Sequence, residues 1–409
     1  MNVCSPYSKP LLFADLRSRL DEEFEAAVSR GVFSGASLLV SRHRNVVFER
    51  TWGRVETTGA PLTPAVRFDL ASLTKPLVTA TLCMTAVEGG SIDLDDPISR
   101  FFPGCVPEDK TAITVRSLLS HSSGLPAYAP FYLELIKLPS GARKDALASM
   151  ILQAPLANPP GKAANYSDLG FMLLGLILER QMGGRLDLLA RDLLFAPLGI
   201  DELHFCLLNG GEDSDTVPPS SPAATLQAGN PAGAPGAYAA TQFCPWRKKL
   251  LSGEVDDENA WALDGVAGHA GLFGTARGVF ELLSFLWDLY EGECRPPSPA
   301  SVPPLPLIGA EIVRLFWTRA ELGAEAPSTW CLGFDTPSPE GYSSAGGVVS
   351  KKAVGHLGFT GVSFWLDLEN RVLIILLTNR VHPTRKNDEI RRFRPLLHDI
   401  VMKALLYGN

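Results

Sequence analysis

The sequence lacks three features, each of which would assign it to a particular class of protein. It has no C-x-x-C pair, and its seven cysteines are scattered, so we expect neither a zinc site nor a disulfide framework. It has no long run of lysine and arginine, and its formal net charge is −7, so nucleic acid is not an expected partner. No apolar stretch reaches the roughly eighteen residues that a membrane-spanning helix needs. We therefore expect no metal, no cofactor, no nucleic acid and no membrane.

The first sixteen residues do not resemble an export signal, and we expect none. Pro6 and Pro10 interrupt this segment, and Cys4 does not follow the apolar run of a lipoprotein signal. Together with the unpatterned cysteines, this favours the reducing cytoplasm as the compartment.

The composition is that of a globular protein. Hydrophobic residues make up 46% of the sequence and charged residues 20%, which differs from the balance of disordered or fibrous chains. A chain of 409 residues can form two ordinary domains or one large unit with two lobes.

Strand patterns gather near the two ends of the chain, and helical patterns fill most of the middle. The predicted strands are residues 36–40, 46–49, 363–368 and 372–378. The predicted helices are residues 17–30, 76–87, 115–120, 169–181, 186–194, 278–289 and 387–406.

This distribution predicts an α/β protein of the α+β type, with an antiparallel sheet flanked by helices and formed by both chain termini. Residues 1–75 and 308–409 would form this α/β lobe, and residues 76–307 an inserted, mostly helical lobe, with a cleft between the two. Residues 217–237 and 295–307 are rich in proline, alanine, serine and glycine and are expected to be long surface loops.

Ser72-Leu73-Thr74-Lys75 is the only Ser-x-x-Lys in the sequence, and it lies where an extended segment meets a helical run. At a helix start, this spacing places the hydroxyl and the amine on one face, beside the free amides of the helix N-terminus. An amine kept neutral by burial or by neighbouring positive charge can take the serine proton. The alternative is a helix-capping serine with a surface lysine.

Tyr166-Ser167-Asp168 follows a Pro-Pro-Gly turn and precedes an apolar helical run. A phenol at such a junction can act as a base toward Ser72 and as an acid toward a leaving group. The alternative is a helix cap, in which Ser167 or Asp168 accepts hydrogen bonds from the first helical amides.

His356-Leu357-Gly358-Phe359 directly precedes the predicted strand 363–368. Glycine at this position would let a substrate approach an edge strand closely. The alternative is that the glycine shapes a bend and the histidine is structural.

The order of these three motifs resembles that of the serine β-lactamase and penicillin-binding protein superfamily, in its class C, carboxypeptidase and esterase branch. Three further stretches are similar to the same family: SIDLDDPISRFFPG (91–104), ITVRSLLSHSSGLP (113–126) and AGHAGLFGTA (267–276). The resemblance therefore spans most of the chain and implies a single β-lactamase-like domain over residues 1–409.

The resemblance implies that Ser72 attacks the scissile carbonyl, with Lys75 and Tyr166 sharing the proton transfers. It implies that the backbone amides of Ser72 and Phe359 form the oxyanion hole. The strand that contains His356, Leu357 and Gly358 would form one wall of the cleft. His121 and His269 lie in family-like stretches, and we expect them to be structural.

The sequence departs from the family pattern at two positions. Family members that act on penicillins or D-alanyl peptides usually carry Tyr-x-Asn and a Lys/His-Thr-Gly strand, which bind the substrate amide and carboxylate. Here Asp168 replaces the amide and Leu357 replaces the hydroxyl, while His356 is at most partly charged near neutral pH. Each missing charge-assisted hydrogen bond is worth about 1.5 to 3 kcal/mol, which favours a substrate without that carboxylate.

The sequence therefore predicts a serine hydrolase that acts on a small ester or lactone through an acyl-enzyme on Ser72, with Asp168, His356, Leu357 and Gly358 contacting the substrate. An amidase or D-amino-acid peptidase on the same machinery, or a weak β-lactamase, remains open. A different alternative is a penicillin-binding-like protein that holds a ligand without turnover. The presence of all three catalytic residues disfavours that last alternative.

Overall fold

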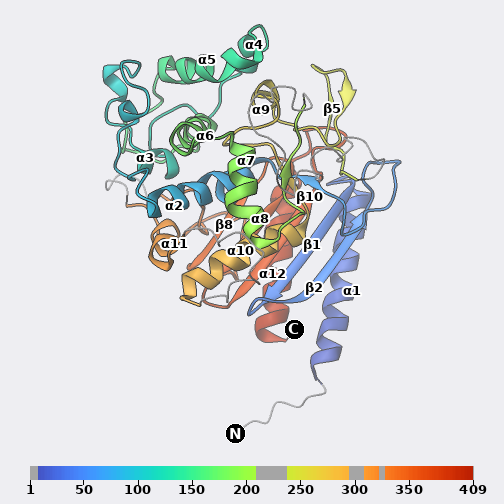
Figure 1. The fold of residues 1–409 in the computed structure, drawn as a ribbon. Coiled ribbons are helices and arrows are strands. Elements are labelled where there is room, and N and C mark those ends of the chain that lie inside the picture. The colour runs from blue at the N-terminus through green and yellow to red at the C-terminus, as the bar shows by residue number, and fades with distance from the viewer. Residues whose placement is uncertain (1–7, 209–236, 294–307, 322–327, 409) are drawn as a thin grey trace.

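A five-stranded antiparallel sheet organises the computed structural model, which describes residues 8–208, 237–293, 308–321 and 328–408. The strand order is β2-β1-β10-β9-β8, so the first two strands of the chain pair with its last three (Figure 1). The strands are β1 (Gly35–Arg42), β2 (Asn45–Gly53), β8 (Ala353–Leu357), β9 (Ser363–Asp367) and β10 (Val372–Thr378). The prediction that both termini build the sheet is confirmed.

The pairing of β1 is set by a tight turn on one side and by an apolar strand on the other. His43 and Arg44 link β1 to β2 with φ angles of 51° and 65°, the left-handed conformation that two-residue hairpins require. On its other edge β1 pairs with β10, in a register that places Leu39 opposite Ile375. Every residue of β10 is buried, because helices cover both faces of the sheet.

Helices from three parts of the chain cover the sheet. On one face lie α1 (Ser8–Ser29) and α12 (Ile390–Tyr407), where Phe24 stacks on Trp52 with ring centroids 3.8 Å apart. On the other face α10 (Ala276–Glu291) packs against β1 and β10. The predicted helices at both ends of the chain and at 278–289 are thus present, and α10 lies on the sheet although it belongs to the stretch expected to form the helical lobe.

A helical region stands beside the sheet, with α6 at its centre in contact with α2, α3, α5 and α7. The predicted helices near 76–87, 115–120, 169–181 and 186–194 all occur here. The elements are α2 (Thr81–Glu88), α3 (Val115–Leu119), α4 (Tyr132–Leu135), α5 (Ser140–Gln153), α6 (Asp168–Met182), α7 (Leu186–Ala190), α8 (Ala196–Leu198), α9 (Glu258–Ala262) and α11 (Ala310–Phe316).

Two small sheets connect these layers, and their strands are too short to show a periodic sequence pattern. One has the order β3-β7-β4 and the other pairs β5 with β6. Their bounds are β3 (Phe68–Asp69), β4 (His204–Phe205), β5 (Phe243–Cys244), β6 (Lys249–Leu250) and β7 (Leu272–Gly274). The strand β3 leads directly into the Ser72 motif.

Some expectations remain open. Residues 217–236 and 295–307 of the proline-rich segments lie outside the described residues, and the lobe boundaries at 75 and 307 stay predictions. Among the described helices, none combines the length and the apolar character needed to cross a membrane.

Candidate active site

Ser72 lies on a sharply bent turn between β3 and a helix. It belongs to a 3₁₀ turn, Ala71–Leu73, and the preceding Ala71 has a φ angle of 46°, which is uncommon for a residue with a side chain. Thr74 fixes the turn by donating its hydroxyl to Ala71 O at 2.7 Å and by accepting the Leu272 amide at 3.1 Å. The serine hydroxyl is therefore presented by a locally strained and firmly held segment.

Lys75 begins the helix that follows, which is a π-helix over Lys75–Ala80. Its side chain has no solvent exposure. The ammonium donates to Ser72 Oγ at 2.9 Å and to His269 O at 3.0 Å, and it lies 2.7 Å from Asp168 Oδ1. The predicted juxtaposition of the Ser72 hydroxyl and the Lys75 amine is thus present.

The charge on Lys75 differs from the expectation of a neutral amine. Burial lowers the pKa of Lys75, but Asp168 and Tyr166 raise it by more, so the net pKa is above its usual value. The physical reason is the carboxylate of Asp168, which the sequence-based argument assigned to the substrate and not to Lys75. The resting lysine is an ammonium in an ion pair.

Tyr166 completes the surroundings of Ser72. Its hydroxyl donates to Ser72 Oγ at 2.7 Å, and its ring packs against His121 and Trp330 with centroids 4.7 and 5.6 Å away. Burial raises the pKa of Tyr166 to about 12, although Lys75 opposes this shift. The phenol is therefore neutral near neutral pH.

The helix-cap interpretation of this motif also holds. Ser167 is the N-cap of α6 and accepts the Gly170 amide at 3.3 Å, while its own amide donates to His121 Nδ1 at 3.1 Å. The cap is compatible with a chemical role, since Ser167 anchors the helix and thereby holds both Tyr166 and Asp168 close to Lys75. His121 is structural in this arrangement.

The β8 strand forms another wall of the site. His356 is buried and donates from Nδ1 to Leu357 O at 2.7 Å, and burial lowers its pKa to about 3, so the ring is neutral. Gly358 has no room for a side chain, because a Cβ there would lie 2.9 Å from Leu70 O. This close approach brings Phe359, which is 50% exposed, next to the turn that carries Ser72.

A cavity of about 720 Å³ opens at these residues, which is within the range of small-molecule sites. Seven of the eight predicted site residues line it, and Lys75 lies buried behind Ser72. Within the described part of the chain, no hydrogen bond uses the Phe359 amide. The lining residues predicted from the sequence are Ser72, Tyr166, Asp168, His356, Leu357, Gly358 and Phe359.

Sequence reasoning missed a group of arginines in the same cavity. Arg380, Arg391 and Arg394 line it, and among the described residues none of the three forms an ion pair. Arg394 is only 5% exposed and donates to Gly358 O at 3.1 Å. The signal was available as the run Arg391-Arg392-Phe393-Arg394 shortly after the last strand.

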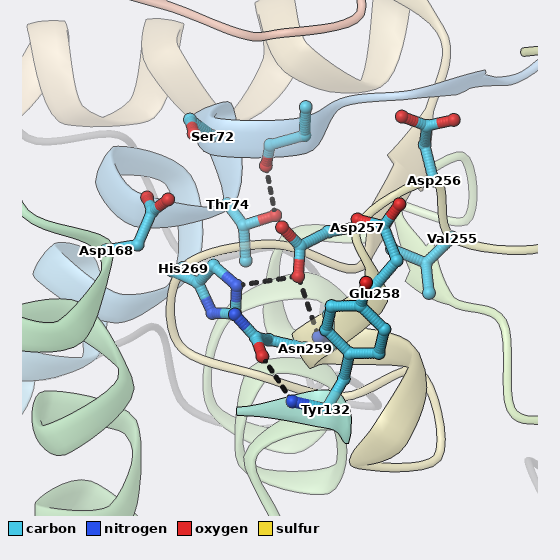
Figure 2. A network of polar contacts seen from close by, with 12 residues as sticks. Ser72, Thr74, Tyr132, Asp168, Val255, Asp256, Asp257, Glu258, Asn259 and His269 are labelled. Atoms are coloured by element: carbon cyan, nitrogen blue, oxygen red, sulfur yellow. Dashed lines mark hydrogen bonds and ion pairs between the residues drawn. The ribbon is translucent and has the colours of Figure 1, made fainter. Parts of the chain in front are cut away.

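Sequence reasoning also missed an acidic loop, Asp256-Asp257-Glu258, which lines the same cavity. Figure 2 shows these three side chains together, with the ring of His269 bonded to Asp257 at 2.9 Å. Because the carbonyl of His269 accepts from Lys75 at 3.0 Å, this bond helps to fix the position of the lysine. Despite its charge, the loop is no candidate metal centre, since no cluster of three metal-ligating side chains occurs among the described residues.

Comparison with known proteins finds similarity along most of the chain. A family model described as Beta-lactamase matches residues 20–398. An Escherichia coli K12 protein named as a candidate D-alanyl-D-alanine carboxypeptidase is 29% identical over 370 residues, which cover 86% of this chain and 79% of that protein.

Solved structures show the same fold. The hydrolase EstCE1, described as having promiscuous acyltransferase activity, is 19% identical with a TM-score of 0.68, over 95% of this chain and 98% of that one. A penicillin-binding protein homologue from Caulobacter crescentus is 21% identical with a TM-score of 0.65, over 99% of both chains.

Proposed function

We propose that this chain, which belongs to the Beta-lactamase family of serine hydrolases, hydrolyses small esters or lactones through an acyl-enzyme on Ser72. One observation carries the proposal: Ser72 Oγ lies between Lys75 Nζ at 2.9 Å and Tyr166 Oη at 2.7 Å. A nucleophile flanked by two proton-transfer groups at hydrogen-bond distance is the arrangement that acyl transfer requires.

In the proposed reaction, Ser72 Oγ attacks the ester carbonyl and the bond to the leaving alcohol breaks. The Ser72 proton ends on that alcohol, and Lys75 and Tyr166 carry it there. Water then attacks the acyl-enzyme, which releases the carboxylic acid and returns the proton to Ser72. The amides of Ser72 and Phe359 would stabilise the oxyanion in both steps.

The Lys75–Asp168 pair supports a specific path for the proton. Lys75 can act as a base only after its proton has moved to Asp168 across the 2.7 Å contact. The raised pKa of Lys75 opposes this transfer in the resting site, so the proton moves only as Ser72 is activated. The Tyr166 phenol, with its pKa raised to about 12, is suited to donate a proton to an alkoxide leaving group, whose basicity is high.

The cavity wall formed by β8 favours a substrate whose acyl group is uncharged. Leu357 offers no hydroxyl, and the neutral His356 offers no positive charge at the position where the family usually holds a carboxylate. Burial is what keeps His356 neutral, as its lowered pKa indicates. A neutral ester or lactone has no carboxylate and therefore loses no hydrogen bond at this wall.

The arginines favour a second candidate, the hydrolysis of a peptide bond next to a free carboxylate. Arg380, Arg391 and Arg394 line the cavity without ion pairs among the described residues, and guanidinium groups bind carboxylates well. The name of the Escherichia coli relative is consistent with such a substrate.

One experiment tests the proposal and separates the candidates. The protein and its Ser72→Ala variant are incubated with a fluorophosphonate, with a neutral p-nitrophenyl ester, with the same ester carrying a terminal carboxylate, and with a D-alanyl-D-alanine peptide. We expect Ser72-dependent labelling and faster turnover of the neutral ester.

The other outcomes have distinct meanings. Unchanged ester turnover by Ser72→Ala would refute Ser72 as the nucleophile. Preference for the carboxylate-bearing ester and for the peptide would favour the second candidate. Stoichiometric labelling of Ser72 without turnover of any substrate would indicate a protein that binds ligands without hydrolysing them.

A further inference from the structure

Asp69 is a buried carboxylate next to the nucleophile that the mechanism above does not use. It ends β3, lines the cavity and is 2% exposed. Its Oδ1 accepts the Ala71 amide at 2.8 Å, and its Oδ2 accepts the Asp256 amide at 2.7 Å. The carboxylate thus joins the turn that carries Ser72 directly to the acidic loop.

The bond to Ala71 falls where the backbone is strained. Ala71 has a φ angle of 46°, a left-handed conformation that is unfavourable for residues with a Cβ. An aspartate that accepts the amide two residues ahead is a known way to stabilise such a turn. The backbone of Asp69 is itself fixed, because its carbonyl accepts the Thr360 hydroxyl at 2.7 Å.

The charges around Asp69 do not favour its ionised form. Besides burial, the carboxylates of Asp256 and Asp257 raise the pKa of Asp69, and the cation bound to Asp256, Arg385, is paired with that carboxylate at 2.8 Å. The adjacent Cys206 thiol is neutral, since burial raises its pKa to about 12. Burial and Asp256 raise the pKa of Asp69 to about 7, while the two bound amides oppose this shift.

We propose that Asp69 is a positioning residue, whose ionised carboxylate holds Ala71 in its strained conformation and thereby aims Ser72 at the substrate. This proposal rests on Ser72 being the nucleophile. When the carboxylate is protonated, both amide bonds lose their charge-assisted character, which roughly halves the strength of such bonds. The turn then relaxes, and Ser72 Oγ leaves its place between Lys75 and Tyr166.

The decisive variant is Asp69→Asn, which keeps one acceptor for Ala71 but turns an NH₂ group toward the Asp256 amide. With the neutral ester, we expect kcat to fall at least about tenfold while KM changes less than about twofold. In the wild type we expect kcat to rise with pH through about 7, where Asp69 ionises. This rise of kcat with pH, the acid limb of the profile, should be absent from Asp69→Asn.

A matched control is Asp367→Asn, at the end of β9. Asp367 is also buried and also accepts backbone amides, from Ser350 at 2.8 Å and Asn370 at 3.0 Å, but it does not line the cavity. We expect this variant to lower the melting temperature without altering the pH dependence of kcat. Asp335 lines the cavity and also has a raised pKa, of about 6, so only the difference between wild type and Asp69→Asn assigns the limb.

A second variant keeps the proposal testable if Asp69→Asn is unstable. Glycine adopts positive φ angles without strain, so Ala71→Gly in the Asp69→Asn background should recover part of the lost kcat. A wild-type kcat and an unchanged acid limb in Asp69→Asn would overturn the proposal, and so would the absence of any recovery in the double variant. Full activity of Ser72→Ala would instead refute the nucleophile, whatever Asp69 does.

Discussion

At the scale of single residues, the charge on Lys75 is decided by a competition between burial and Asp168. Burial alone would lower its pKa and give the neutral amine that the motif suggests. The carboxylate, 2.7 Å from Nζ, reverses the direction. The identities of Ser72, Lys75 and Tyr166 could be predicted from the sequence, because the three motifs occur in a recognisable order. The charge state of Lys75 could not be predicted, because it depends on the contact with Asp168. Asp168 is distant from Lys75 in the sequence and meets it only in the folded chain.

Dependence on the folded structure also explains why the sequence did not identify Asp69 and the arginines as candidate site residues. Asp69 lies only three residues before Ser72, but its function depends on the φ angle of Ala71 and on the Asp256 loop, which is distant in the sequence. Arg394 lies on a helix whose pattern predicts only an amphipathic surface. Both become candidate functional residues only once the chain has folded around the cavity.

Tyr166→Phe tests the residue-scale argument. The ring would keep its packing against His121 and Trp330, so the variant should fold normally. Loss of the hydroxyl removes a proton-transfer group, and we expect kcat for the neutral ester to fall by about 10² to 10⁴ with little change in KM.

The control for this variant is Tyr290→Phe, since Tyr290 stacks on Trp317 and does not line the cavity. Steady-state kinetics and melting temperatures of both variants are compared. A kcat for Tyr166→Phe within threefold or so of the wild type would contradict the role of Tyr166.

At the scale of elements, the long periodic segments were predictable and the short ones were not. The β-rich runs 363–368 and 372–378 correspond to β9 and β10, and the apolar run after Asp168 corresponds to α6. In contrast, β3, β4 and β7 have only two or three residues each, which is too short for a periodic pattern. The residues of the π-helix at Lys75 do not distinguish it from an α-helix. These elements exist because of tertiary contacts.

One such contact holds the loop before β7 against α6. A Cβ on Gly268 would lie 2.2 Å from Phe171 O, so only glycine permits this approach. Gly268 O accepts the Thr79 hydroxyl at 2.6 Å, and the next carbonyl, that of His269, accepts from Lys75 at 3.0 Å. The loop therefore transmits the position of α6 to the lysine.

Gly268→Ala should force this loop away from α6. We expect the free energy of unfolding to fall by about 1 to 3 kcal/mol, as in other overpacked interiors, and kcat to fall with it because Lys75 loses an acceptor. Chemical denaturation and ester hydrolysis measure the two effects.

Gly170→Ala is the matched control within α6. A Cβ at Gly170 would lie 3.5 Å or more from its neighbours, and alanine is favoured over glycine in a helix by about 0.5 to 1 kcal/mol. This variant should be as stable as the wild type or more stable. Equal stability of Gly268→Ala and Gly170→Ala would show that the loop is free to move.

At the scale of the whole molecule, folding buries titratable groups far from the cavity as well as near it. Four histidines have pKa values lowered by burial, which is the largest cause in each case. The pKa of His204 falls to about 4, those of His356 and His398 fall to about 3, and that of His121 falls well below its usual value. All four are therefore neutral in the folded protein at pH 5.

These histidines and two aspartates act in opposite directions when the pH falls. A histidine whose pKa is lowered by folding takes up its proton more readily in the unfolded chain, so it destabilises the fold below about pH 6.5. Asp69 and Asp335, with pKa values raised to about 7 and about 6, bind protons more readily in the folded chain and stabilise it over the same range. Protonated Asp69 therefore favours folding while, by our proposal, it disfavours catalysis.

At pH 5 the four histidines bind about four more protons in the unfolded chain than in the folded one, and the two aspartates bind about two fewer. The unfolded chain therefore carries about two more protons than the folded chain. The free energy of unfolding should then fall by roughly 2 to 3 kcal/mol per pH unit near pH 5, and less steeply near pH 7, where the histidines of the unfolded chain are only partly protonated. Urea denaturation at pH 7.0, 6.0 and 5.0 measures this slope.

His398→Leu is the variant that tests the cause of the slope. Neither ring nitrogen of His398 forms a hydrogen bond with the described residues, and the residue lies on the buried face of α12, so leucine removes a titrating group and no hydrogen bond. Because one of the two net protons disappears, the slope should fall to about half. A variant as acid-sensitive as the wild type, or a wild type equally stable at pH 7 and pH 5, would mean that the neutral histidines do not set the acid limit of this fold.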